Sequence, residues 1–151
     1  MILFALFLMF SPIIVQTWDE LIFHTSISCR HTHRPNFDYQ IQFYEEDDLG
    51  LFIKDDPVTS WFGARKIQGG GQKYRVNYFA QAEGDTGPEY EFGARIKHNC
   101  LLNRAIEDVK VLFTQNYCQV RGGNCHVYLS LDLAGLLEGS KRQVRIVQRY
   151  N

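Results

Sequence analysis

Two histidines one residue apart form the strongest metal-binding pattern in the chain. In an extended segment His31 and His33 point to the same side, a spacing that can chelate zinc or copper. Two ligands are too few for a site, so a third histidine would have to converge on them. The histidines that can do so are His24, His98 and His126. Arginines and a proline surround the pair, which favours an exposed turn. A secreted metal-dependent enzyme using His31 and His33 is the alternative.

Carboxylates are concentrated in one stretch of the chain. The six acidic residues of this stretch are Glu45, Glu46, Asp47, Asp48, Asp55 and Asp56. Clustered carboxylate oxygens can bind Ca²⁺, but the Asp-x-Asp-x-Asp-Gly spacing of a calcium loop is absent. We therefore predict a solvated loop, which can also dock a basic partner, and we assign no metal ligand.

Nucleophile and phosphate-binding motifs are missing. The chain has no Gly-x-Ser-x-Gly, and Ser130 lies in an ordinary alternating run. The glycines at residues 69–71 lack the Lys-Ser/Thr of a phosphate loop and read as a turn. We predict no catalytic residue and no cofactor, and therefore a protein that is not an enzyme.

One aromatic pair lies beside one basic pair. Trp61 and Phe62 are followed closely by Arg65 and Lys66, a combination typical of side chains at a membrane interface. These four residues are our predicted surface-binding set. The alternative is a half-buried loop that packs its aromatic rings on the fold.

The beginning of the chain reads as a secretory signal peptide. Residues 1–18 carry no charge, and an apolar run from Ile2 to Phe10 is followed by Pro12. A membrane anchor is the alternative, but a spanning helix needs about 20 apolar residues, and this run is shorter. We predict a signal peptide over residues 1–17, a single domain over 18–151, and a secreted, extracellular protein that does not span a membrane.

Secretion favours disulfide bonds between the four cysteines. Cys118 and Cys125 flank a Gly-Gly turn that can bring their sulfurs together, which leaves Cys29 and Cys100 as the second pair. Both of the latter lie in the apolar register of their strands. Loop-closure entropy gives the long loop about 4 kcal/mol and the short loop about 2.5 kcal/mol.

The rest of the chain alternates apolar and polar residues with period two, the pattern of half-buried strands. The alternating runs cover residues 21–29, 37–43, 74–81, 90–100, 109–113, 127–133 and 144–148. Residues 51–53 can add an eighth strand, and 103–108 is a short helical candidate. Aromatic residues make up 14% of the chain, which favours β structure. We predict an all-β, antiparallel, disulfide-stabilised sandwich of seven or eight strands.

The charge balance bears on the partners. The chain has 16 Lys and Arg against 17 Asp and Glu, a net charge of −1, which argues against a nucleic-acid partner. The charges are segregated along the chain, so local patches can still meet anionic lipid or an oppositely charged protein surface.

The order of several features resembles a known family. A first strand ends in Cys29, a later strand runs into the acidic stretch, another begins at Gly71, and a His-x-Cys closes a strand at His98 and Cys100. In these features the chain is similar to the nematode transthyretin-like family of small secreted proteins. The chain departs from the family in having Gly71-Gln72-Lys73-Tyr74 where Gly-x-Phe is usual, and in its tail beyond Glu138.

The resemblance implies a transthyretin-like or immunoglobulin-like β-sandwich that acts by binding. The partner expected from it is a lipid, a small apolar ligand or a cell-surface protein, and a structural, matrix-associated protein is a further alternative. The hydroxyisourate hydrolases of the same fold end in Tyr-Arg-Gly-Ser, whereas this chain ends in Gln148-Arg149-Tyr150-Asn151. The resemblance therefore does not extend to that enzyme activity.

Overall fold

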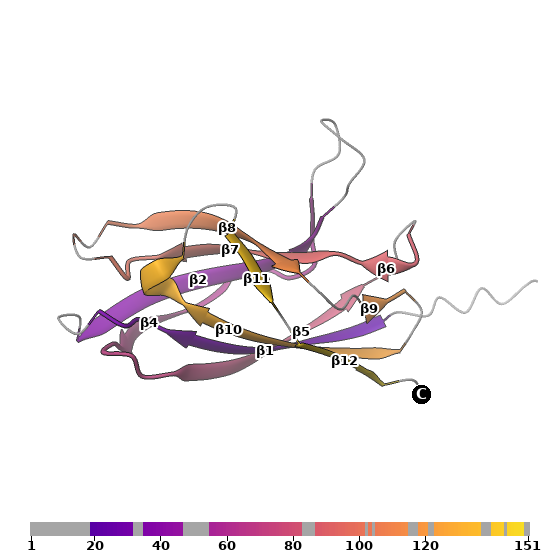
Figure 1. Ribbon diagram of the computed structural model, residues 1–151, viewed down its shortest axis with the longest axis horizontal. Coiled ribbons are helices and arrows are strands. Elements are labelled where there is room, and N and C mark those ends of the chain that lie inside the picture. Colours follow the sequence, from indigo (N-terminus) through magenta and orange to yellow (C-terminus); the bar gives the residue numbers. More distant parts are fainter. Residues whose placement is uncertain are drawn as a thin grey trace, which may run out of the picture.

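The computed structural model describes residues 19–31, 35–46, 55–82, 87–101, 103, 105–114, 118–120, 123–136, 140–143 and 145–149 (Figure 1). The predicted signal peptide, His33, and the predicted strand over 51–53 lie outside these residues. Two sheets contain most of the described chain, so the all-β prediction is confirmed. The described part includes no helix that is both long enough and apolar enough to cross a membrane.

The first sheet contains β12 (Arg145–Arg149), β10 (Asn124–Asp132), β1 (Asp19–Ser28) and β5 (Tyr74–Ala82), hydrogen-bonded in that order. A 3₁₀ turn (Leu133–Gly135) follows β10. In β1, alternate residues from Leu21 to Ile27 are buried, as the period-two pattern predicts. Strand β5 has a neighbour on one side only, which makes it an edge of this sheet.

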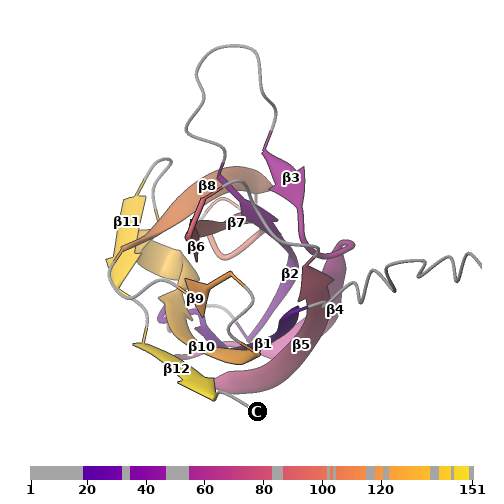
Figure 2. The same cartoon turned by 90° about the vertical axis from the view of Figure 1, so that its right-hand side faces the viewer.

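The second sheet contains β11 (Ser140–Gln143), β8 (Glu107–Thr114), β7 (Phe92–His98), β2 (Asn36–Glu45) and β3 (Asp56–Pro57) in that order, and β4 (Phe62–Gln68) also pairs with β2. Two short strands, β6 (Glu89–Tyr90) and β9 (Cys118–Gln119), pair with each other. Figure 2 shows the two large sheets facing each other around a common interior, which gives a sandwich-like arrangement.

The prediction of a purely antiparallel fold is wrong for two strand pairs. Strand β1 runs parallel to β10, and β11 runs parallel to β8. In both cases the chain between the two paired strands passes through the facing sheet. Such a crossover, unlike a hairpin, allows the second strand to lie parallel to the first.

Aromatic rings from both sheets meet in the core. Phe23 of β1 stacks on Phe43 of β2 with ring centroids 4.0 Å apart, and the Phe92 ring of β7 meets Phe23 edge-on at 5.5 Å. Phe23 and Phe43 are fully buried. Because each buried phenylalanine contributes about 1.5–3 kcal/mol, this contact is a principal link between the sheets.

Both predicted disulfides are present. Cys29, just after β1, is bonded to Cys100, just after β7, with Cα atoms 5.9 Å apart. Cys118 is bonded to Cys125, with Cα atoms 6.0 Å apart. The first bond joins the two sheets, and the second joins β9 to β10.

The structure differs from the sequence prediction in two places. Strand β4 was not predicted, and the helix predicted at 103–108 is not present in the described residues. A bulge between Phe37 and Tyr39 shifts the pairing of β2 with β4, and Lys66 has a positive φ of 54°. The bulge lets Ala64 and Ile67, three residues apart, both pack on the core, so β4 shows no simple alternation. Residues 107–108 belong to β8, because the pairing of β8 with β7 extends to them.

Candidate functional site

An exposed phenylalanine stands on the edge strand of the first sheet. Strand β5 buries Tyr78 and Ala82, and the opposite register exposes Phe79, whose exposed fraction is 68%. The other large apolar side chains exposed in the described residues are Tyr74 (38%) and Ile106 (78%). Leaving a phenylalanine in water forgoes about 1.5–3 kcal/mol of burial, so its position is informative.

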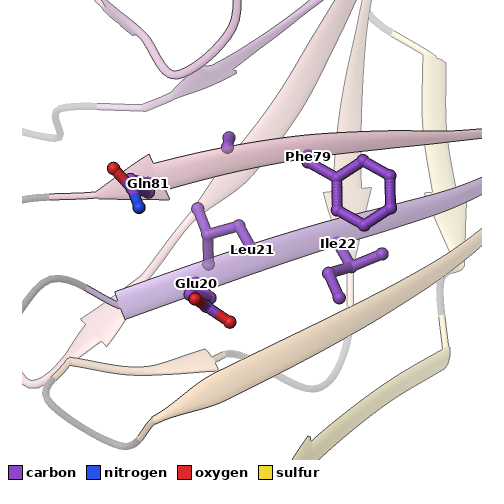
Figure 3. A pocket seen from close by; sticks show the side chains of 6 residues that line it. Glu20, Leu21, Ile22, Phe79 and Gln81 are labelled. Carbon is purple, nitrogen blue, oxygen red and sulfur yellow. The ribbon is translucent and has the colours of Figure 1, made fainter.

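A first hollow lies on the outer face of β1 and β5, and we call it the outer-face hollow. Its volume is about 450 Å³, and it is lined by Glu20, Leu21, Ile22, Phe79, Ala80 and Gln81. Figure 3 shows the Phe79 ring beside Ile22, with Glu20 and Gln81 at the other end. Phe79 and Ile22 lie opposite each other in the β1–β5 register. The hollow therefore has an apolar end and a polar end.

A second hollow opens between the edge strands β4 and β5, and we call it the edge hollow. Its volume is about 420 Å³, and aromatic rings supply most of its side-chain lining: Tyr39, Phe62, Tyr74, Tyr78 and Phe79. The Phe62 and Tyr78 ring centroids are 4.9 Å apart, and those of Tyr39 and Tyr74 are 6.2 Å apart. Phe79 lines both hollows, so the two meet at its ring.

Two buried tyrosines, Tyr39 and Tyr78, belong to the lining of the edge hollow. The hydroxyl oxygens of Tyr39 and Tyr78 are 2.8 Å apart. Burial raises the pKa of both phenols, so both stay neutral at physiological pH. Their mutual hydrogen bond uses one of the two hydroxyl protons. The pair can therefore donate the other to an acceptor oxygen of a ligand.

The structure separates the four residues of the predicted surface-binding set. Phe62 packs against the core and lines the edge hollow. Trp61 lies on the outer side of the second sheet, where the Lys97 ammonium is 4.8 Å from its ring. Arg65 and Lys66 are exposed, and the Lys66 backbone N–H donates to the Asp38 carboxylate at 2.7 Å.

The histidines fall into separate environments. His24 Nε2 and His126 Nδ1 are 2.9 Å apart on the outer face of the first sheet. His98 is buried in the second sheet, and His31 is half-buried just after β1. Among the described residues, no three His, Cys, Asp or Glu side chains gather as a metal site would require.

His98 is a core histidine with a backbone partner. Its Nδ1 accepts a hydrogen bond from the Cys100 backbone N–H at 3.2 Å, which places the proton of the neutral ring on Nε2. Burial lowers the pKa of His98 to about 4. The nearest carboxylate oxygen, on Glu107, is 3.8 Å from Nε2. His98 is therefore neutral at physiological pH and supports the fold around the Cys29–Cys100 bond.

Sequence reasoning missed Tyr74, Tyr78 and Phe79 as site residues. All three lie in a run that was interpreted only as a strand. The available signal was Phe79 itself, an aromatic residue in the register otherwise occupied by the polar Arg75, Asn77 and Gln81. That the free edge of this strand lies near β4 could not be inferred, because β4 was not predicted.

Comparisons with known proteins give no further assignment. No family model, no curated protein and no solved structure matches this chain.

Proposed function

We propose that the protein is a secreted, extracellular binding protein of the transthyretin-like type, and that it takes a small apolar ligand at the Phe79 edge. Two disulfides are compatible with an oxidising, extracellular location. The transthyretin-like type is proposed from the sequence resemblance, and an all-β, sandwich-like fold with a Cys29–Cys100 bond between its sheets is compatible with it. Neither feature identifies a ligand, which has to be argued from the site.

The observation that carries the proposal is the exposed Phe79 side chain, which lines both the outer-face hollow and the edge hollow. Each hollow has a volume of about 420–450 Å³, within the range of small-molecule sites. An alkyl chain or ring system laid over Phe79 would gain about 0.8 kcal/mol for each CH₂ removed from water. The Tyr39–Tyr78 hydroxyl pair supplies a polar anchor for one oxygen of such a ligand.

The direct test is titration of the secreted, fully oxidised protein with a fluorescent fatty acid, 11-(dansylamino)undecanoic acid. Because the Phe79 ring is worth about 1.5–3 kcal/mol when covered, Phe79→Ala is expected to weaken binding by roughly ten- to a hundredfold. Ile106→Ala is the matched control, since Ile106 is also a large exposed apolar residue and lines neither hollow. Its affinity is expected to match that of the unsubstituted protein.

Two results would count against this function. The first is equal weakening by Phe79→Ala and Ile106→Ala, which would indicate unspecific adsorption to exposed apolar groups. The second is no saturable binding at all, which would redirect the assignment to recognition of a cell-surface protein by the same face. The intact mass of the secreted chain tests the location, because cleavage after Thr17 removes residues 1–17.

A further inference from the structure

The outer face of the second sheet carries a groove that the proposed function does not use. It has a volume of about 760 Å³ and crosses β2, β7 and β8 beside β3. We call it the polar groove. Its lining differs from that of the two apolar hollows, because charged and amide side chains outnumber apolar ones. The residues used below are Gln42, Tyr44, Trp61, Arg95, Asp108 and Lys110.

Two aromatic rings form part of the groove wall. The hydroxyl end of the Tyr44 ring packs closely on Gly93, where an added Cβ atom would lie only 2.2 Å from it. The Lys110 ammonium is 4.8 Å from the Tyr44 ring, and the Lys97 ammonium is 4.8 Å from the Trp61 ring. Both aromatic side chains are thus held in place by their neighbours.

Three charged residues of the groove, Arg95, Asp108 and Lys110, are held in ion pairs. Arg95 donates two hydrogen bonds to the Asp108 carboxylate, each 2.9 Å long. Lys110 contacts Asp55 at 2.9 Å and Glu46 at 3.5 Å. These carboxylates raise the pKa of Lys110, against the opposing effect of burial. Because cations and anions alternate, the groove presents donors and acceptors together and has no single strong charge.

We propose that the polar groove binds a neutral saccharide. Sugar hydroxyls both donate and accept. The Gln42 amide nitrogen donates to the Thr59 carbonyl, and its amide oxygen and the further lone pairs of the Asp108 carboxylate can accept hydrogen bonds from such hydroxyls. The C–H face of a pyranose packs on the electron-rich face of an aromatic ring, a role that Trp61 can fill. A polyanion would be repelled by the carboxylates of Asp55 and Asp108. An apolar ligand would displace water from the charged side chains of the lining without replacing its hydrogen bonds.

The test uses the secreted, oxidised protein and four probes: chitohexaose, maltohexaose, mannohexaose and a heparin-derived hexasaccharide. Binding is measured by calorimetry and by saturation-transfer NMR at low and high salt. We expect at least one neutral hexasaccharide to bind with an affinity that does not change with salt. Trp61→Ala is expected to weaken that binding by at least about tenfold. Asp108→Asn, a nearly isosteric change in a partly exposed ion pair, is expected to weaken it as well.

Phe79→Ala is the matched control, since Phe79 is an exposed aromatic residue on the other sheet. It is expected to leave saccharide binding unchanged, while Trp61→Ala leaves fatty-acid binding unchanged. The proposed saccharide site and the proposed fatty-acid site are therefore tested independently of each other. The proposal is overturned if no neutral probe binds, if only the sulfated probe binds and salt abolishes its binding, or if both Trp61→Ala and Asp108→Asn retain full affinity for a neutral probe.

Discussion

Acidification should destabilise the protein through His98. Burial lowers the pKa of this histidine to about 4 in the folded protein, from 6.5 for an unperturbed side chain. Between these two values the unfolded chain binds a proton that the folded protein does not. The stabilising contribution is therefore fully present above the unfolded pKa and is lost as the pH falls through 6.5 toward 4.

The size of the effect follows from the two pKa values. At about pH 7 the histidine is almost entirely neutral in both the folded and the unfolded state, so its protonation changes the free energy of unfolding by close to zero. At about pH 5 the unfolded histidine is almost fully protonated and the folded one is still mostly neutral, which costs about 2 kcal/mol. The full difference in unfolding free energy is about 3 kcal/mol and is reached below the folded pKa.

The assay is urea unfolding of the oxidised protein at several pH values, compared with His98→Asn. Asparagine does not titrate, and its side-chain oxygen can replace Nδ1 as the acceptor of the Cys100 N–H. Carboxylates other than Glu107, which lies 3.8 Å from His98 Nε2, contribute equally to both proteins, so the difference in slope reports the histidine together with that contact. Parallel stability curves for the two proteins between about pH 7 and pH 5 would refute the reasoning.

Three further substitutions and one control test the packing by their effect on stability. Replacing both Cys29 and Cys100 by Ser should cost about 4 kcal/mol, and an unchanged urea midpoint would contradict the entropic account. Gly93→Ala should cost about 1–3 kcal/mol, because its Cβ would collide with the Tyr44 ring 2.2 Å away. Gly135→Ala, which meets nothing within 4 Å, should be close to neutral, and equal costs for the two would refute the steric argument. Phe23→Ala should cost about 3–5 kcal/mol, measured as a shift of the thermal midpoint.

The grouping of residues in the candidate site could not be predicted from the sequence. Phe62 was singled out for an aromatic-basic pattern, yet its ring is in the edge hollow, apart from Trp61. The partner that places it there is Tyr78, from a strand of the other sheet. A spacing pattern along one strand contains no information about which strand edge will lie opposite, so this contact could not be predicted.

The sequence alone determined the local features of the fold. Period-two alternation is a property of one strand and its burial. The strands β1, β2 and β5 could therefore be predicted from their own residues. The Cys118–Cys125 bond follows from a turn within a few residues. Only the tertiary structure decided the parallel pairing of β1 with β10, the bulged strand β4 and the grouping of side chains into hollows and groove. These features depend on contacts between residues distant in the chain, whose free energy is set by the packing of whole sheets.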